Sequence, residues 1–284
     1  MKAHQRIIRE QKAKEKPLLL FPDKPSVIDI KNATVRPVSY KTAEKIIKEY
    51  EWLGGMGNAY KHYGIYFNGY CGGVVCFGFP SASASRKNHH PLDVVVGKNY
   101  GQYVIQLVRG ACVHWAHPHS ATKLISSACK QLKNNYPIIK IILAYADENA
   151  GEIGTIYQAD NWLYIGKNDP KNRNSYYVIN GIPYDPRDAI KLFNSVAKEK
   201  LKGIDPEYYT IKRSAKHQYL KWVGSKGEKK QWMKNIIIQP YPKRIAVQDS
   251  RENRSDTIGE SLGQYQSTAQ YLNDKNNIRM RQNA

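Results

Sequence analysis

The residues best suited to chemistry lie in one segment, which reads YADENAGEIGTIYQADNW from Tyr145 to Trp162. The apolar run before it, residues 138–146, predicts a buried strand. Side chains two apart on a strand share a face, so we expect Tyr145 and Asp147 together at its carboxyl end, where ligand crevices of open α/β sheets lie. The following glycines allow a tight turn. Tyr157 then begins a short helix that we expect to return its hydroxyl to the same crevice, giving a base and a proton relay.

The same residues also have a purely structural interpretation. Asp147 can cap the turn that follows it, with the tyrosines as half-buried packing. Arg109 poses a similar choice, because it lies within an apolar strand, VIQLVR over 104–109. A buried guanidinium needs an acid, a phosphate or a solvated face, and the polar face of an edge strand is the alternative.

The elements that would position these residues predict an α/β fold with a mixed central sheet flanked by helices. Asn68-Gly69 is a strong hairpin signal between two of its strands, and Asp185-Pro186 is a helix start. Ser120 is the expected N-cap of a helix. We expect helices over 41–52, 120–134 and 186–201, and strands over 62–67, 71–79, 102–114, 138–146, 162–166 and 175–184.

The composition indicates a globular chain with a polyanionic partner. Hydrophobic residues make up 41%, enough for a core, and 44 Lys and Arg against 24 Asp and Glu give a net charge of +20. No apolar run approaches the about 20 residues of a membrane helix, and the basic N-terminus lacks the apolar centre of a signal peptide. The four cysteines form no CxxC site. These features predict a cytoplasmic protein with reduced thiols.

The C-terminal region has the composition expected of a nucleic-acid contact. Eleven basic residues oppose three acidic ones between 201 and 244, with aromatic residues interleaved. Lysines suit phosphates and aromatic rings suit bases, although a charge run is also typical of a solvated face. The candidate DNA contacts are Lys212, Arg213, Lys216, Tyr219, Lys221 and Trp222.

We expect four regions along the chain. A basic N-terminal arm (1–17) precedes the catalytic domain (18–184). A basic, aromatic-rich extension (185–244) packs on that domain, and a polar, disordered tail (245–284) follows.

Other ligand sites have weaker support. The histidines of the HWAHPH run (114–119) fit no zinc spacing, so loop histidines are favoured over a metal site. The strand-to-helix junction at 113–120 holds no glycine, which leaves only the helix N-terminus at Ser120 as a weak cofactor contact. Neither a P-loop nor a dinucleotide fingerprint is present.

The motifs together resemble the bacteriophage Mom-like DNA-modification proteins, over about residues 35–244. The segments that carry this resemblance are CGGVVCFGFPSA (71–82), QLVRG (106–110), HPHSATKLISSACKQLKNNYP (117–137), YADENAGEIGTIYQADNWLYIG (145–166), KHQYLKW (216–222) and QPYPK (239–243). The resemblance implies a fold related to the GNAT acyltransferases. It also implies conversion of adenine in DNA to an N6-carbamoylmethyl (acetamido) adenine, which protects phage DNA from restriction in the bacterial host.

The resemblance implies functional roles for Arg109, Asp147 and Tyr157. At two positions where the family has histidines, this chain has Glu51-Trp52 after the first helix and Glu152 before GTIY. We retain these three residues as candidate substrate or DNA contacts. The donor implied is acetyl-CoA or another acyl or glycyl carrier, and iron is a further candidate.

The chemistry of adenine agrees with this interpretation. Its N6 amine is a poor nucleophile, so a base such as Asp147, relayed by Tyr145 or Tyr157, must remove a proton. The base must also leave the duplex, which requires stacking rings such as Trp52 and a phosphate grip. Arg109 could hold a donor phosphate or stabilise developing negative charge. The alternatives are a GNAT-type acetyltransferase acting on a protein or small amine, and a non-catalytic nucleic-acid-binding protein.

Overall fold

The computed structural model divides the chain into two compact units. The first holds residues 1–168 and 216–243, and the second holds 169–215 and 244–284. The expected boundary at 184/185 does not coincide with this division: residues 169–184 belong to the second unit, and residues 216–243 return to the first. The structure describes residues 3–15, 28–51, 54–80, 103–168, 175–180, 182–184, 186–211, 215–234 and 236–243. The tail expected from 245 lies outside them.

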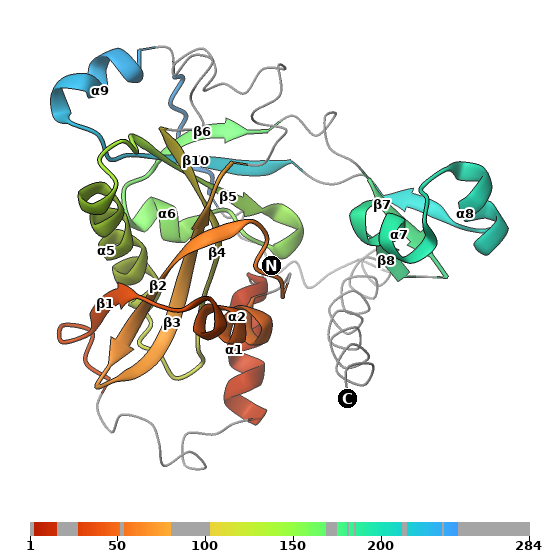
Figure 1. The fold of residues 1–284 in the computed structure, drawn as a ribbon, viewed down its shortest axis with the longest axis horizontal. Helices are drawn as coiled ribbons and strands as arrows, with labels where there is room; N and C mark the ends of the chain where they lie inside the picture. The colour runs from red at the N-terminus through yellow and green to blue at the C-terminus, as the bar shows by residue number, and fades with distance from the viewer. Residues whose placement is uncertain are drawn as a thin grey trace, which may run out of the picture. The chain divides into compact units, whose positions relative to one another are not determined.

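A mixed sheet forms the centre of the first unit, in the strand order β1-β2-β3-β4-β5-β10-β6 (Figure 1). The strands are β1 Thr34–Pro37, β2 Ala59–Phe67, β3 Tyr70–Gly78, β4 Val104–Cys112, β5 Ile141–Asp147, β6 Leu163–Lys167 and β10 Lys216–Trp222. Within this described sheet β4 and β5 run parallel, and the other neighbours are antiparallel. The predicted α/β class with a mixed sheet is confirmed.

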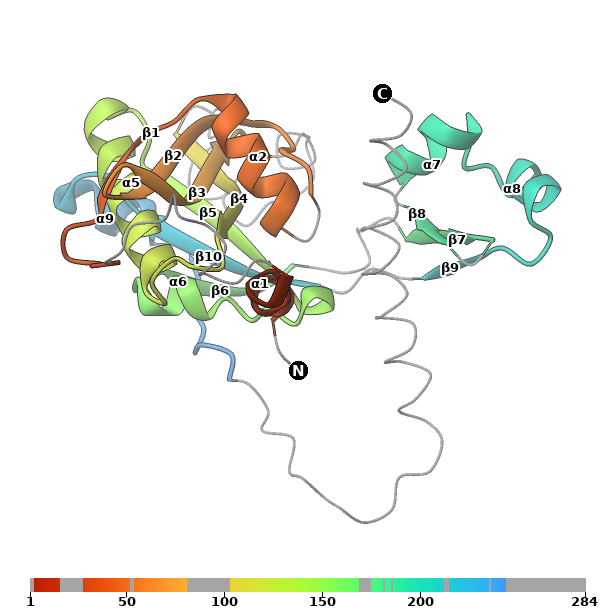
Figure 2. The ribbon, with the colours of Figure 1, turned by 90° about the horizontal axis from the view of Figure 1, so that it is seen from below.

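Helices flank this sheet. They are α1 His4–Glu15, α2 Tyr40–Tyr50, α5 Ser120–Asn135, α6 Thr155–Ala159 and α9 Lys226–Trp232. The periodic apolar residues of α2 are buried as predicted, and α2 lies against β2, β3 and β4 (Figure 2). The N-cap of α5 is His119, so the prediction of Ser120 as N-cap is wrong. Ser120 instead forms the first helical residue and is fully buried.

The N-terminal arm is a helix that contacts the core. Gln5 Nε2 donates to the carbonyl of Gly110 at 2.8 Å, and Arg9 Nη2 donates to that of Ala116 at 2.9 Å. Ile8 packs against the main hydrophobic cluster. The N-terminal helix is therefore not only charged; its side chains also bind it to the core.

Turn residues set the connections of the sheet. Asn68 and Gly69 both have positive φ, 49° and 90°, which confirms the predicted two-residue hairpin between β2 and β3. The parallel pairing of β4 and β5 extends over three residue pairs, from Val104↔Ile141 to Gln106↔Leu143. Beyond these pairs the two strands part, and this opening positions the candidate site.

The second unit interrupts the chain between β6 and β10. Its three-stranded antiparallel sheet has the order β8-β7-β9, formed by β7 Tyr176–Ile179, β8 Ile182–Tyr184 and β9 Tyr209–Ile211. The strand predicted over 175–184 is a hairpin, with Asn180 at φ 51°. The helix predicted to 201 is two, α7 Pro186–Phe193 and α8 Lys198–Ile204, because Asn194 at φ 55° leaves the helical region.

No helix in the described ranges has the length and apolar character needed to span a membrane.

Replacing Gly154 should destabilise the first unit. Gly154 precedes α6 with φ 78°, and an added Cβ would lie 2.3 Å from Cε2 of the buried Tyr219. We expect Gly154→Ala to lower the free energy of unfolding by at least about 2 kcal/mol, measured by urea denaturation. Gly227 in α9 has no atom within 4 Å of such a Cβ, so Gly227→Ala should be neutral or stabilising by up to about 1 kcal/mol. Equal effects of the two substitutions would contradict this account.

Candidate active site

The candidate site surrounds the opening between β4 and β5. Arg109 lies three residues beyond Gln106, and Asp147 lies four residues beyond Leu143, where the last parallel pair ends. Because the two strands are parallel, both residues lie toward their carboxyl ends. The structure thus brings two of the predicted catalytic residues to the two sides of one opening.

A β-bulge and a glycine loop fix Arg109. Cys76 pairs with Arg109 and Phe77 with Leu107, which leaves Val108 as the extra residue of β4. Arg109 Nε donates to the carbonyl of Gly55 at 2.6 Å, and Nη1 donates to that of Val108 at 2.8 Å. The loop lies close, since a Cβ added at Gly57 would be 3.0 Å from Val108 Cγ1. The bulge and loop therefore hold the guanidinium in one orientation.

Glu51 supplies the acid that a half-buried Arg109 requires. It follows α2 directly, its side chain is 6% exposed, and Oε2 lies 3.7 Å from Arg109 Nε. The backbone N–H of Gly54 donates to the same oxygen at 3.1 Å. In the sequence, Glu51 was selected only because it lies at a position where the family has a histidine. Its pairing with Arg109 was not predicted. Trp52, the neighbouring candidate, lies outside the described residues.

Tyr157 is a buried, neutral phenol. Its ring centroid lies 5.2 Å from those of Trp162 and Tyr219. Burial raises the pKa of Tyr157 well above its usual range, and the negative charges of Glu152 and Glu51 raise it further. Two carboxylates therefore contribute to the raised pKa of Tyr157: that of Glu152 and that of Glu51, which pairs with Arg109. A phenol in this setting keeps its proton and acts as a hydrogen-bond donor.

Asp147 and Tyr145 share a face, as predicted, but Tyr157 does not join them. Lys216 Nζ pairs with Asp147 Oδ2 at 2.8 Å, and these two residues are partners in the register of β10 with β5. Tyr219, which packs on Tyr157, has the opposite parity on β10 and therefore lies on the other face. The expectation that Tyr157 returns to the crevice of Asp147 is wrong, because α6 packs on the opposite side of the sheet.

Tyr145 is also held neutral. Burial raises the pKa of Tyr145 to about 12, opposed by a hydrogen bond with the side chain of Gln218, its partner on β10. Tyr145 can therefore donate a hydrogen bond near Asp147 but does not supply a base at neutral pH.

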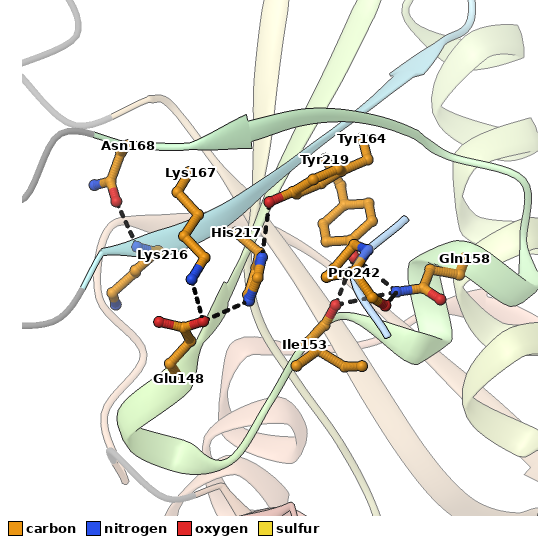
Figure 3. Close-up of polar contacts among 10 residues, drawn as sticks. All are labelled: Glu148, Ile153, Gln158, Tyr164, Lys167, Asn168, Lys216, His217, Tyr219 and Pro242. Atoms are coloured by element: carbon orange, nitrogen blue, oxygen red, sulfur yellow. Dashed lines mark hydrogen bonds and ion pairs between the residues drawn. The ribbon is translucent and has the colours of Figure 1, made fainter. Parts of the chain in front are cut away.

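The basic, aromatic strand 216–222 lies inside the sheet as β10. Tyr219 has no exposed surface; its hydroxyl donates to the carbonyl of Ile153 and accepts from Gln158 Nε2 at 2.9 Å (Figure 3). Lys221 forms an ion pair with Asp160, and the Trp222 ring lies 5.7 Å from that of Trp232. These side chains make intramolecular contacts, which leaves Tyr219 out of reach of DNA. Lys212 and Arg213 lie outside the described residues.

His217 is a buried titratable residue that the sequence interpretation did not select. Its Nδ1 lies 2.9 Å from the Tyr164 hydroxyl, and Nε2 lies 3.0 Å from Glu148 Oε1, off the line of a good hydrogen bond (Figure 3). Lys167 Nζ approaches the same carboxylate oxygen at 2.5 Å. Burial lowers the pKa of His217; Glu148 raises it and Lys167 lowers it. The sequence signal that could have identified it is the alternation in KHQYLKW, which puts His217 on the same face of the strand as Tyr219.

The remaining candidate ligand sites are sparse. Ser120 Oγ is buried at the start of α5 without a hydrogen-bond partner in the described part of the chain. No group of three or more His, Cys, Asp or Glu among the described residues could hold a metal ion, so no residues there fit the candidate iron. The four cysteines are unpaired, and burial raises the pKa of Cys76, Cys112 and Cys129 to about 12. These thiols are structural.

Comparison with known families assigns the chain. The sequence profile of the Mom protein family matches residues 32–243. The chain belongs to the Mom protein family. One relative is the methylcarbamoylase Mom of Escherichia phage Mu, which is 24% identical over 196 residues, covering 66% of this chain and 74% of that protein.

Solved structures with which this Mom-family chain aligns include acetyltransferases. A GNAT family acetyltransferase from Elizabethkingia anophelis with acetyl-CoA bound aligns over 67% of this chain and 98% of its own, at a TM-score of 0.36 and 10% identity. An N-acetyltransferase from Staphylococcus aureus Mu50 aligns over 68% and 99%, at 0.36 and 12%.

The His217 contacts predict a pH dependence of stability. Because the pKa of His217 is lower in the folded than in the unfolded chain, the unfolded chain binds more protons near pH 6.5. The contribution of His217 to stability should therefore be constant above about pH 7 and should be lost as the pH falls below the unfolded-state pKa. His217→Gln should remove this part of the decrease, measured by urea denaturation between pH 7.5 and 5.5.

His119 provides the matched control, because it is exposed in the loop before α5. His119→Gln should leave the pH dependence of the wild type unchanged. A dependence that is the same in His217→Gln and wild type would show that His217 is not buried in its neutral form.

Proposed function

We propose that this chain is a DNA-modifying transferase that places a carbamoylmethyl (acetamido-type) group on the N6 amine of adenine in DNA. Membership of the Mom protein family and the phage Mu methylcarbamoylase relative support the activity. The observation that carries the proposal is the Arg109–Glu51 pair at the β4–β5 opening, whose carboxylate also contributes to the raised pKa of the Tyr157 phenol. A fixed cation, a carboxylate and a hydrogen-bond donor are the groups that such a transfer requires.

The amine of adenine sets the demands on these groups. Its lone pair is delocalised into the ring, so a base must remove a proton as the new bond forms. Arg109, held by Gly55 and Val108, would stabilise negative charge that develops on the transferred group. Tyr157, which keeps its proton, would donate a hydrogen bond to substrate or donor.

Two carboxylates compete for the role of base. Asp147 is the candidate from the sequence, and in the structure it is paired with Lys216. Glu51 lies on the side of Arg109 and influences Tyr157 electrostatically. The two candidates are separable, since their side chains belong to different elements and have different cationic partners.

For a carbamoylmethyl group, which contains two carbons and an amide nitrogen, the donor that we propose is a glycyl carrier, because a glycyl unit holds these atoms. Acetyl-CoA or another simple acyl carrier would instead leave an acyl group on N6. Beyond Gln106, the edge of β4 is free of β5 and offers backbone groups to an extended chain that bears amides. One carbonyl in this part of β4, that of Gly110, is already occupied by the side-chain amide of Gln5. We propose DNA as the substrate because the net charge of the chain, +20, favours association with phosphates.

Mass spectrometry of nucleosides from cells that express the chain tests the proposal. We expect a new adenosine-derived nucleoside whose mass shift identifies the transferred group. Arg109→Gln should lower its yield about 100-fold or more, because a fixed charge at the reacting atoms is lost. Arg36→Gln is the matched control: Arg36 is exposed on β1, where it lies over the Tyr66 ring, and its replacement should leave the yield unchanged.

Parallel measurements on Asp147→Asn and Glu51→Gln assign the base. Loss of product in one variant alone identifies that carboxylate, and full activity in both would refute a carboxylate base. If the wild-type protein is soluble and binds DNA but the DNA of the cells contains no modified nucleoside, the result would favour a non-catalytic binding protein. Acetylation of a protein or small amine instead would favour a GNAT-type acetyltransferase.

A further inference from the structure

Two aromatic rings form an exposed stack at the open end of the β2–β3 hairpin. The centroids of Tyr60 and Phe79 lie 4.5 Å apart with an interplanar angle of 23°. Tyr60 is 40% exposed and Phe79 is 57% exposed. Large apolar surface left in water is costly, so an exposed stack of this kind is a feature of binding surfaces.

A β-bulge in β2 sets the position of Tyr60. In the pairing of β2 with β3, Ala59 faces Gly78 and Lys61 faces Phe77, so Tyr60 is an extra residue without a partner. Such a bulge re-aims a side chain, and bulges are frequent beside active sites. Here the bulge turns the Tyr60 ring onto Phe79 instead of into the regular row of β2.

The stack is connected to the candidate site through one short loop. Asn58 Nδ2 donates to the carbonyl of Phe79 at 2.5 Å, and Gly55 of the same loop accepts from Arg109 at 2.6 Å. Gly57, between them, lies against Val108. The loop that fixes Arg109 therefore also fixes the backbone at Phe79.

The charge beside the stack suits a nucleic acid. Lys61 Nζ lies 5.7 Å from the centroid of Tyr60 and 4.2 Å from that of Tyr136, to whose hydroxyl it donates. Aromatic faces stack on every base, and neighbouring cations contact the phosphates of a single strand. The aromatic residues of β10 do not offer this surface, because Tyr219 is fully buried and Trp222 packs on Trp232.

We propose that Tyr60 and Phe79 form a stacking platform for an unpaired DNA base close to the β4–β5 opening. This inference rests on DNA as the substrate of the proposed function. The platform supplies what modification of a base requires, since a base leaves the duplex only if its lost stacking is replaced. It reads the face of a base and not its edge, so it carries no sequence preference.

Fluorescence anisotropy with the full-length protein tests the platform. The probes are a labelled single-stranded 16-mer and an abasic 16-mer with the same phosphates. Tyr60→Ala and Phe79→Ala should each weaken binding of the 16-mer about ten-fold, with an unchanged dependence on salt, because no phosphate contact is lost. Binding of the abasic strand should not change. Tyr60→Phe, which keeps the ring, should bind as the wild type does.

Tyr70→Ala is the matched control, because Tyr70 is 41% exposed at the other end of the same hairpin. It should bind both probes normally. Equal losses in Tyr70→Ala, equal losses for the abasic strand, no loss in the platform variants, or no binding of the 16-mer by the wild type would each overturn the proposal. If the platform result holds without a modified nucleoside, the proposed function fails alone; if modification occurs and the platform variants bind normally, the platform fails alone.

Discussion

The short parallel contact between β4 and β5 is the constraint on which the rest of the first unit depends. Three residue pairs join the strands. Beyond Gln106 and Leu143, the end of each strand is held by contacts with other elements. On one side a bulge and a glycine loop bind Arg109; on the other β10 continues the sheet as far as Asp147. The two strands separate there because each strand end is held by a different element.

Matched charges stabilise the elements around this opening. Arg109 is paired with Glu51, and Lys216 with Asp147, in each case across elements distant in sequence. The two carboxylates are buried while their cations remain partly exposed, so removing a cation would leave a poorly solvated negative charge and should destabilise the fold. Lys216 and Lys221 therefore have structural roles in a segment whose composition suggested DNA contact. The net charge of the chain says little about which individual lysines face a partner.

The sequence predicted features that depend on local rules. The hairpin at Asn68-Gly69, the buried stripe of α2 and the shared face of Tyr145 and Asp147 follow from backbone preference and periodicity. Features that depend on distant pairing were not predictable in this way. The face on which Tyr157 packs, the burial of Tyr219 and the pairing of Glu51 with Arg109 require knowledge that β10 enters between β5 and β6 and that α2 ends beside β4.

The position of β10 also determines when the fold can be completed. It is the last strand of the seven in sequence, yet it lies between β5 and β6, and residues 169–215 come before it. During synthesis β5 and β6 must therefore wait with unpaired backbone edges until residue 222 has left the ribosome. Such edges pair readily with other chains, and contacts over long sequence separations form slowly. A nascent chain of this protein is thus most vulnerable to aggregation after the segments of the candidate site have been made and before strand β10 has been synthesised.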